Sequence, residues 1–508
     1  MACKQIAGQA GNDNKIASWD CDTSSKENKD MAEQSLKEKT ARGLFWGGLS
    51  NGAQQLLNLF FGIFLARILS RADYGMVGML SIFSLIASTL QESGFTAALA
   101  NRKEVQHKDY NAVFWFSSLV GLTLYILLSF CAPLIARFYD TPELTPLARY
   151  SFLGFFISSL GTAQSAYMFR NLMVRQRAMS MMISLVISGT AGVILALNGF
   201  AYWGIATQNI VYVTSVTCCY WYFSPWRPTI HIDFRPLKGM IAFSSRLLMT
   251  NIFSNINNNI LSVILGKFYS EQEVGDYNQA NKWNYMGYSV VTGMVSGVAQ
   301  PILANVADDR ERQKRIFRKM LRFTAFVSFP TLFGLSLITP ELITIAITAK
   351  WMASAQILRM LCIGSAFTSI ITLYSSLIIS KGKSGIFMWN TVILGIIQIA
   401  VMLCSYPYGI PTMIKIYVSI NICWLLVWQY FVWREIHLTL LQALKDIIPF
   451  ALTAGASMLV TGYATQGIGN IYIAFAAKII MAAALYITVM WLSGSVTFKE
   501  SLQYIRKR

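Results

Sequence analysis

The chain has 508 residues, of which 55% are hydrophobic and only 13% are charged, and its mean hydropathy is +0.47. These values exclude an ordinary soluble globular domain, so the sequence predicts a polytopic membrane protein. The net charge of +18 is compatible with a nucleic acid or with a membrane surface as partner, and the placement of the basic residues decides between them.

Apolar runs follow a polar N-terminal segment. Residues 1–36 lack the apolar core of a signal peptide, so we expect a disordered cytoplasmic segment, in which Met31 is a second candidate start. Beyond it, runs of about 20 apolar residues are long enough to cross roughly 30 Å of hydrocarbon. We place fourteen spans at 43–66, 75–99, 112–136, 147–169, 178–199, 202–223, 239–266, 280–305, 321–346, 355–380, 385–405, 412–433, 447–465 and 471–493. The predicted fold is therefore all-α and polytopic, with about fourteen transmembrane helices.

The basic residues follow the predicted topology. With the N-terminus inside, the inner connections hold most Lys and Arg, including the run DDRERQKRIFRKMLR at 308–322. The outer loops hold only Arg67, Arg71, Arg137, Lys267, Lys282, Lys350 and Lys415. This positive-inside asymmetry, with an even number of spans, places both termini in the cytoplasm. The charge thus reflects topology, and no nucleic-acid partner is expected.

An internal repeat relates the two halves of the chain. NGAQQLLNLFFGIFLARILSRADYG, from residue 51, lies without gaps over NIFSNINNNILSVILGKFYSEQEVG, from residue 251, and residues 148–160 lie over 358–370. Because an even number of crossings separates the copies, two six-helix bundles of the same orientation are predicted around a central cavity. The expected parts are 1–36, the N-lobe at 37–223, a cytoplasmic linker at 224–238, the C-lobe at 239–433, and a last helix pair with a cytoplasmic tail at 434–508.

Amide side chains form a stripe on each of the two repeated spans. At about 100° per residue, they share one face of their helix. The stripes consist of Asn51, Gln54, Gln55 and Asn58 on the first span and Asn251, Asn255 and Asn258 on the seventh. Amides that face lipid would lose hydrogen bonds to water at several kcal/mol each, so these faces look onto other helices or a wet cavity. We predict that they line the cavity and bind a hydroxyl-rich ligand, with hydrogen-bonded packing between helices as the alternative.

Few ionisable residues lie within the spans, and each is a candidate for function. Glu92 is the one acid that we place well inside a span, either as the site of a coupling proton or cation or as the partner of an arginine. The candidates for binding an anionic diphosphate are Arg149, Arg246, Lys282 and Arg359. Arg246 is the deepest and has a planar fork, whereas Arg149 and Arg359 lie near outer helix ends and could equally reach the interface. Lys282, among aromatic residues near the outer end of its span, binds a diphosphate or simply lies at the interface. Lys478 is expected to serve packing or to extend to the interface, and not transport.

Enzymatic signatures are missing from the sequence. The eight cysteines have no metal-ligand spacing, the three histidines lie in loops, and neither a Walker loop nor an HExxH motif occurs. We therefore expect no catalytic residue, metal or cofactor.

Several stretches resemble a known family. FLARILSRADYGMVGMLSIFSLIASTLQESGF and NNNILSVILGKFYSEQEVGDYNQANKW resemble the polysaccharide transporter family, the Wzx-type flippases. These belong to the same superfamily as the multidrug and toxic-compound exporters and the lipid II flippase. The likeness covers roughly residues 35–440, and its most specific mark is the block LAR-x-L-S-x-x-[DE]-[YF]-G. Many relatives carry an aspartate just before the ILG block of the seventh span, where this chain has NNN.

The resemblance implies a function in the bacterial cytoplasmic membrane. It implies a flippase that translocates undecaprenyl-diphosphate-linked oligosaccharide units to the periplasmic leaflet by alternating access, for O-antigen, capsule or exopolysaccharide. The implied partners are this lipid-linked glycan, membrane lipid and the polysaccharide polymerase or export machinery, with a monomeric transport unit. A multidrug cation antiporter of the same architecture is the main alternative, and a non-transporting scaffold is another. The antiporter would prefer an acidic cavity, whereas the buried charge here is mostly basic.

Overall fold

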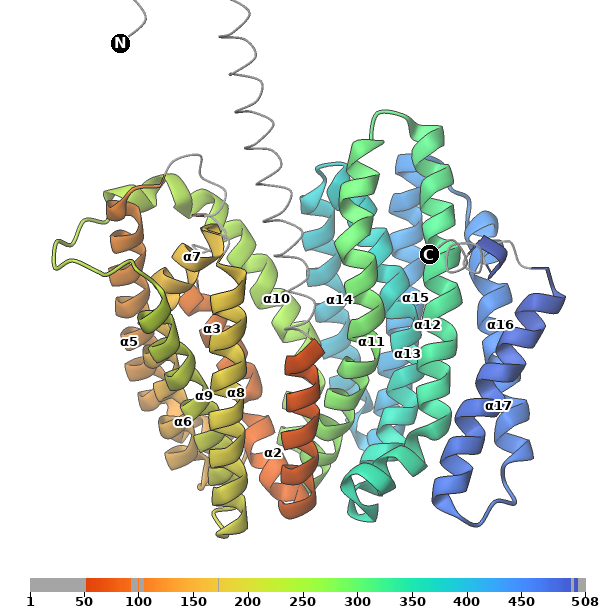
Figure 1. The fold of residues 1–508 in the computed structure, drawn as a ribbon, viewed down its shortest axis with the longest axis horizontal. Helices are drawn as coiled ribbons and strands as arrows, with labels where there is room; N and C mark the ends of the chain where they lie inside the picture. The colour runs from red at the N-terminus through yellow and green to blue at the C-terminus, as the bar shows by residue number, and fades with distance from the viewer. Residues whose placement is uncertain (1–51, 93–98, 100–104, 172, 495–497, 501–508) are drawn as a thin grey trace, which may run out of the picture.

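The computed structural model describes residues 52–92, 99, 105–171, 173–494 and 498–500. The structure is 88% helical, and no strand occurs among the described residues. Two helical bundles stand side by side, and a last helix pair lies at the outer edge of the second (Figure 1). The predicted all-α fold with two bundles and a C-terminal pair is confirmed.

The first bundle occupies one side of the molecule. Its helices are Gly52–Ile68, α2 (Arg71–Met79), α3 (Ser81–Glu92), α5 (His107–Phe138), α6 (Leu144–Ser159), α7 (Thr162–Arg170), α8 (Val174–Leu197) and α9 (Tyr202–Phe223). A long connection then leads to the short 3-10 helix η1 (Arg235–Leu237), with which the second bundle begins.

The second bundle and the C-terminal pair complete the fold. Their helices are α10 (Lys238–Phe268), α11 (Glu271–Asn305), α12 (Arg310–Ile347), α13 (Met352–Ser380), α14 (Ser384–Ser405), α15 (Ile410–Ile436), α16 (Leu440–Ala464) and α17 (Ile471–Leu492), with the 3-10 turns η2 (Ala349–Trp351) and η3 (Tyr406–Tyr408). A single large core, to which both bundles contribute, includes α2, α6, α10, α11 and α13.

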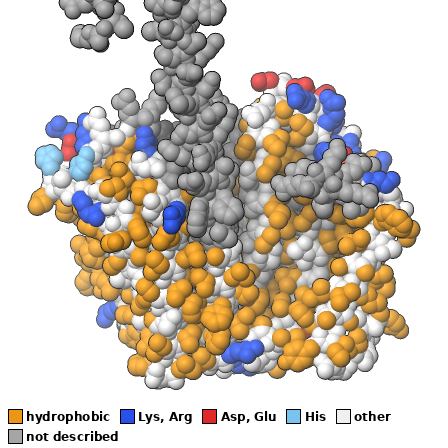
Figure 2. Space-filling model, viewed as in Figure 1, with side chains coloured by type: hydrophobic (Ala, Val, Ile, Leu, Met, Phe, Trp, Pro, Cys, Tyr) orange, Lys and Arg blue, Asp and Glu red, His pale blue; other side chains and the backbone are white. Residues whose placement is uncertain are grey.

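Within the described residues, each of the fourteen predicted spans falls on a helix or on two consecutive helices. Nine described helical stretches are long and apolar enough to cross a membrane. Helices α10 and α11 have 31 and 35 residues but are not among the nine, because their sequences carry many polar side chains. In the view of Figure 2, Lys and Arg gather along the upper edge above a broad hydrophobic band.

The repeat predicted from the sequence reappears in the helix starts. Ser70 caps α2, its hydroxyl accepting from the Asp73 backbone N–H while the Asp73 carboxylate accepts from the Ser70 N–H. Ser270 and Glu273 form the same capping box at the start of α11. Since each box satisfies backbone donors that a helix start leaves open, α2 and α11 begin in the same way in the two bundles.

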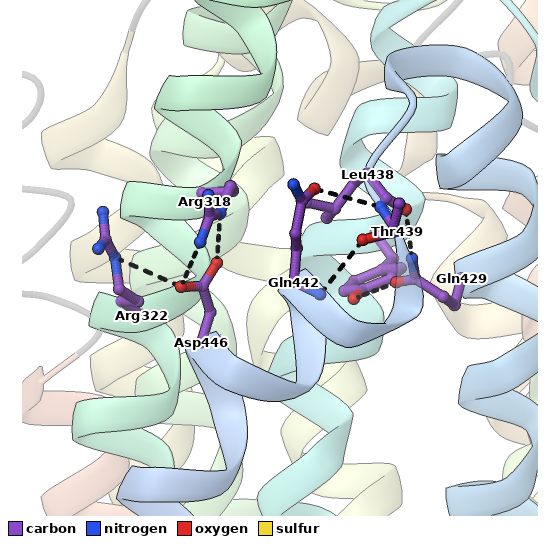
Figure 3. A network of polar contacts seen from close by, with 8 residues as sticks. Arg318, Arg322, Gln429, Leu438, Thr439, Gln442 and Asp446 are labelled. Atoms are coloured by element: carbon purple, nitrogen blue, oxygen red, sulfur yellow. Dashed lines mark hydrogen bonds and ion pairs between the residues drawn. The ribbon is translucent and has the colours of Figure 1, made fainter.

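Ion pairs fasten the C-terminal helices to α12. Arg318 donates to both carboxylate oxygens of Asp446 on α16, at 2.6 and 3.0 Å, and Arg322 lies 3.9 Å from the same carboxylate (Figure 3). Closer to the other end of α12, Lys478 of α17 donates to Glu341 at 2.6 Å. The expectation that Glu92 is the one acid well inside a span was therefore wrong, because Glu341 also lies within a predicted span. Lys478 has a specific partner there instead of general packing.

Candidate functional site

The two bundles meet most closely where α2 crosses α11. A Cβ atom on Gly75 would lie 1.8 Å from the carbonyl oxygen of Glu271, and one on Gly275 would lie 1.9 Å from that of Arg71. In the repeat, Gly75 is equivalent to Gly275 and Arg71 is equivalent to Glu271. The two close contacts are therefore equivalent to each other, as a pseudo-two-fold axis requires. No side chain larger than hydrogen fits at either position, so two backbones touch directly. We call this region, residues 66–75, 140–141, 267–276 and 345–354, the contact end.

A buried carboxylate lies beside this crossing. Asp276 on α11 is 2% exposed and accepts from Arg71 of α2 at 3.0 Å and from Ser354 of α13 at 3.0 Å. The other arm of Arg71 donates to Gln272 at 3.2 Å. Because both oxygens of Asp276 have donors, the ion pair tolerates its low exposure. Arg71 therefore links the first bundle to two residues of the second.

Cationic side chains also bind backbone carbonyls across the contact end. Arg67 donates from Nε and Nη2 to two carbonyl oxygens in the last turn of α12, each at 2.7 Å. In return, Lys350 donates to the carbonyl oxygens of Arg67 and Leu69 at 2.8 and 2.7 Å. The Trp351 indole donates to the Ala66 carbonyl oxygen at 2.8 Å. These bonds satisfy carbonyls at helix ends that have no helical partner.

Burial at the contact end raises the pKa of two acidic side chains that lie before the predicted eighth span. It raises the pKa of the Asp276 carboxyl above its usual value, although the nearby Arg71 guanidinium acts in the opposite direction. Burial also raises the pKa of Glu271, and the neighbouring Asp73 adds to this effect while a hydrogen bond from Thr141 opposes it. The closed contact end therefore holds protons on these carboxyls more tightly than water-exposed carboxyls would.

The seventh-span amides lie farther along α10, between the bundles. Asn255 donates to the Thr89 hydroxyl of α3 at 2.7 Å, which is a contact from the second bundle to the first. Asn251 and Asn258 are exposed, and Ser262, on the same side of the helix, is buried and donates to Asn278 of α11 at 3.0 Å. The predicted stripe therefore includes one inter-bundle hydrogen bond and two accessible amides.

The first-span stripe is described in part. Gln55 and Asn58 are exposed on the helix Gly52–Ile68, and Gln54 is half-buried. Asn51 lies outside the described residues, and so do the side chains of Glu92 and Arg246, although α3 and α10 include their positions. Arg149 is exposed and its Nε donates to the Ser129 carbonyl oxygen of α5 at 3.3 Å, while Arg359 is exposed near the start of α13.

Sequence analysis missed Asn257, which points away from the stripe. It is 9% exposed and donates to the Thr391 carbonyl oxygen of α14 at 2.6 Å. A Cβ atom on Gly395 would lie 1.9 Å from the Asn257 Oδ1 atom, so α14 has a glycine where this amide approaches. Nearby on α14, Gln398 donates to Asn421 of α15 at 3.2 Å. The second bundle thus contains a row of amides between α10, α14 and α15. The sequence indicated it, because asparagines occur on both faces of α10.

Lys282 of α11 lies between the bundles and has no acidic partner among the described residues. A Cβ atom on Gly62 of the first helix would lie 2.9 Å from the Lys282 Nζ atom, so the ammonium group lies directly against the first bundle. The side chain is nevertheless exposed, and no described residue forms a hydrogen bond or an ion pair with it. An ammonium between two bundles, without a described partner, is suited to an anionic ligand.

Comparison with known proteins agrees with this architecture. The family model described as "Polysaccharide biosynthesis protein" matches residues 64–356, which is more than half of the chain. The chain belongs to this family. The match includes the contact end, Lys282 and the amides of α10, and it places the chain among the polysaccharide transporters of the multidrug/oligosaccharidyl-lipid/polysaccharide exporter superfamily.

Individual members of the family and of the superfamily are similar along most of their length. The teichuronic acid biosynthesis protein TuaB of Bacillus subtilis is 24% identical over 432 residues, which are 84% of this chain and 89% of TuaB. The lipopolysaccharide biosynthesis protein WzxC of Escherichia coli is 24% identical and matches 70% of this chain and 73% of its own. The lipid II flippase MurJ in an inward closed conformation superposes with a TM-score of 0.73 at 16% identity, covering 91% of this chain and 99% of its own. The last likeness concerns the fold.

Proposed function

We propose that this polysaccharide transporter is a flippase for undecaprenyl-diphosphate-linked oligosaccharide units. It moves them from the cytoplasmic to the periplasmic leaflet of the bacterial cytoplasmic membrane, for assembly of O-antigen, capsule or exopolysaccharide. The observation that carries the proposal is the ammonium of Lys282, which has no partner in the described part of the chain and lies exposed between two bundles whose facing helices bear amide stripes. The names of the family and of relatives such as TuaB and WzxC support the substrate class.

The transport step requires no covalent chemistry, since a flippase only moves its substrate across the bilayer. Alternating access needs two forms, in which the space between the bundles opens to one side at a time. The contact end supplies one closed gate, and its rupture with closure at the opposite end would give the second form. The excess of basic residues in the connections opposite the contact end supports an orientation with the contact end toward the periplasm and both termini in the cytoplasm.

Charged and neutral side chains bind different parts of the substrate. Lys282 binds the diphosphate, because an ammonium is a compact donor for phosphate oxygens. Amides such as Gln55, Asn58, Asn251 and Asn258 have donors and acceptors without charge, and they suit sugar hydroxyls. Arg149 and Arg359 remain further diphosphate candidates, and the coupling ion is assigned to no described residue.

The test is complementation of a deletion strain, with surface polymer and lipid-linked repeat units measured at matched protein levels. Loss of polymer on deletion with accumulation of lipid-linked units, restored by the wild type, is the expected result. Lys282→Gln should export about tenfold less or worse, because a hydrogen bond to a charged group contributes roughly 1.5–3 kcal/mol. Lys282→Arg should retain part of the activity.

The matched control is Lys415→Gln, which removes an exposed lysine from α15. We expect full export from this variant. Normal polymer on deletion, in a strain without a redundant transporter, would refute the flippase. Resistance to cationic dyes on overexpression, with unaffected polymer, would favour the antiporter instead.

A further inference from the structure

A second polar cavity lies entirely within the first bundle. It has a volume of about 310 Å³ and lies between the α6–α7 segment and helices α8 and α9. This volume is at the lower end of the range of roughly 300–1,000 Å³ that is typical of small-molecule sites. Residues that line it include Arg177, Ser158, Ser165, Tyr212 and Thr217. None of these belongs to the surfaces between the bundles that the transport proposal uses.

Arg177 brings a positive charge into this cavity. It lies in the first turn of α8, and its guanidinium packs 5.1 Å from the centre of the Phe169 ring. Its Nε atom is buried and has no hydrogen-bond acceptor in the described protein. No carboxylate lines the described walls of the cavity. A partly buried arginine normally has a carboxylate or a carbonyl oxygen as its partner. Among the described residues, Arg177 has neither, so an anionic partner is missing from this site.

Free hydroxyl groups line the same cavity as the guanidinium. The side chains of Ser158, Ser165 and Tyr212 form no hydrogen bond in the described part of the chain, whereas Thr217 donates to the Ile157 carbonyl oxygen at 3.3 Å. Each free hydroxyl can donate one proton to an oxyanion. Three hydroxyl donors around one arginine match a tetrahedral anion with several oxygens better than a planar neutral amide or a sugar ring.

We propose that this cavity is a binding site for a phosphate group. A phosphate in the cavity would accept from the two Nη atoms of Arg177, because the fork of an arginine can hold two phosphate oxygens side by side. The hydroxyls of Ser165 and Tyr212 donate to the remaining oxygens. Arg170 belongs to the same end of the bundle and adds to the positive potential that attracts an anion.

Two sources can supply such a phosphate, namely the headgroup of a membrane phospholipid and a soluble phosphate or diphosphate. The site lies at the start of α8, at the end of the bundle opposite the contact end, where the predicted inner leaflet has its headgroups. Both sources share the chemistry that the cavity recognises, and the experiment separates them.

The test uses the purified full-length protein in detergent and measures its melting temperature against increasing concentrations of three probes. These are phosphatidylglycerol, inorganic diphosphate, and oleate as an anionic lipid without phosphate. A ligand that binds only the folded protein raises the melting temperature according to its dissociation constant. We expect phosphatidylglycerol, diphosphate or both to stabilise the wild type, and oleate to have a much smaller effect.

Variants assign the effect to the cavity. Arg177→Gln should need about tenfold more probe or worse, and Arg177→Lys should lie between it and the wild type because the charge remains but the fork is lost. Arg175→Gln, an exposed position two residues earlier on the same turn, removes the same charge and should bind like the wild type. Ser165→Leu fills the cavity while leaving Arg177 in place, and should also abolish stabilisation, which keeps the test decisive if Arg177→Gln fails to fold.

Stabilisation by phosphatidylglycerol alone would identify the phospholipid as the source, and stabilisation by diphosphate would identify a soluble phosphate. Equal stabilisation by oleate, wild-type binding by Ser165→Leu, or an equal loss with Arg175→Gln would overturn the proposal. So would the absence of any effect of all three probes. Since binding is measured without transport, these outcomes are independent of the export assay.

Discussion

At the residue scale, the few basic residues expected in the outer loops have specific contacts. Arg67, Arg71, Lys267 and Lys350 each donate to a group of the opposite bundle. A basic residue on that side works against the usual charge asymmetry of membrane proteins, so its presence calls for a structural reason. Four of them hold the bundles together, while Lys282 has no partner among the described residues. We therefore assign the four bonded residues to the gate and Lys282 to the candidate ligand site.

The glycines at the crossing should be essential for closing the contact end. Gly75→Ala or Gly275→Ala places a methyl group within 2 Å of a backbone carbonyl, so α2 and α11 have to separate. We expect each variant to lose most of its polymer export at normal protein levels, measured in the complemented deletion strain. Gly293→Ala on the same helix is the control, since nothing lies within 4 Å of its added Cβ atom. Full export by Gly75→Ala would contradict a gate at this crossing.

Acid should favour the closed contact end. Burial raises the pKa of Asp276 and Glu271 in the closed form, whereas both carboxyls would regain their usual values when the bundles separate. The closed form therefore binds more protons, and protonation stabilises it relative to the open form as the pH falls toward the raised pKa values. The measurement is the labelling rate of Val274→Cys, a buried position, by an impermeant thiol reagent in a background without native cysteines. Because thiol reagents react with the thiolate, every cysteine labels more slowly in acid, so the rate is divided by that of a solvent-exposed cysteine at the same pH. We expect this ratio to fall between pH 7 and 5 and to depend less on pH in Glu271→Gln; a ratio that rises in acid would contradict the prediction.

At the element scale, the positions of helices were predictable, and their interruptions were not. The ninth and fourteenth predicted spans, 321–346 and 471–493, lie on α12 and α17, although α12 begins earlier, at Arg310 within the basic run. The breaks between α2 and α3 and between α6 and α7 fall inside apolar stretches, where hydrophobicity carries no signal for a change of direction. Glu341 was overlooked because its partner is remote in sequence.

The ion pair between α12 and α17 should stabilise the attachment of the C-terminal helices. Glu341 and Lys478 are each 14% exposed, so removing one partner leaves an uncompensated charge among apolar groups. We expect Lys478→Gln to destabilise the protein by roughly 3–5 kcal/mol, seen as a lower melting temperature in detergent. The double variant Glu341→Gln with Lys478→Gln should recover most of this loss, because it buries no lone charge. Equal melting temperatures for the single variant and the wild type would show that the pair contributes nothing.

At the scale of the whole molecule, the repeat predicted two bundles of equal orientation, but not how they face each other. Asn255 and Asn257 are two residues apart and therefore about 200° apart around α10. One contacts α3 of the first bundle and the other α14 of its own bundle. A run of asparagines is polar on every face, so the sequence alone could not tell which amides meet the other bundle. The sequence did not reveal the contact end either, because the bonds that join the two bundles there link residues at least 127 positions apart.

Transport should require the bundles to separate at the contact end. Asp140 of the first bundle and Lys267 of α10 form an ion pair at 2.9 Å in which the Asp140 side chain is 80% exposed, so replacing both residues costs little stability. In a background without native cysteines, Asp140→Cys with Lys267→Cys should export polymer until a short reagent that forms disulfides with both thiols bridges them. Export should then stop and return when a reductant removes the bridge, whereas each single-cysteine variant stays active throughout. Undiminished export by the bridged protein would mean that the substrate crosses without opening this end, and the alternating-access mechanism would have to be abandoned.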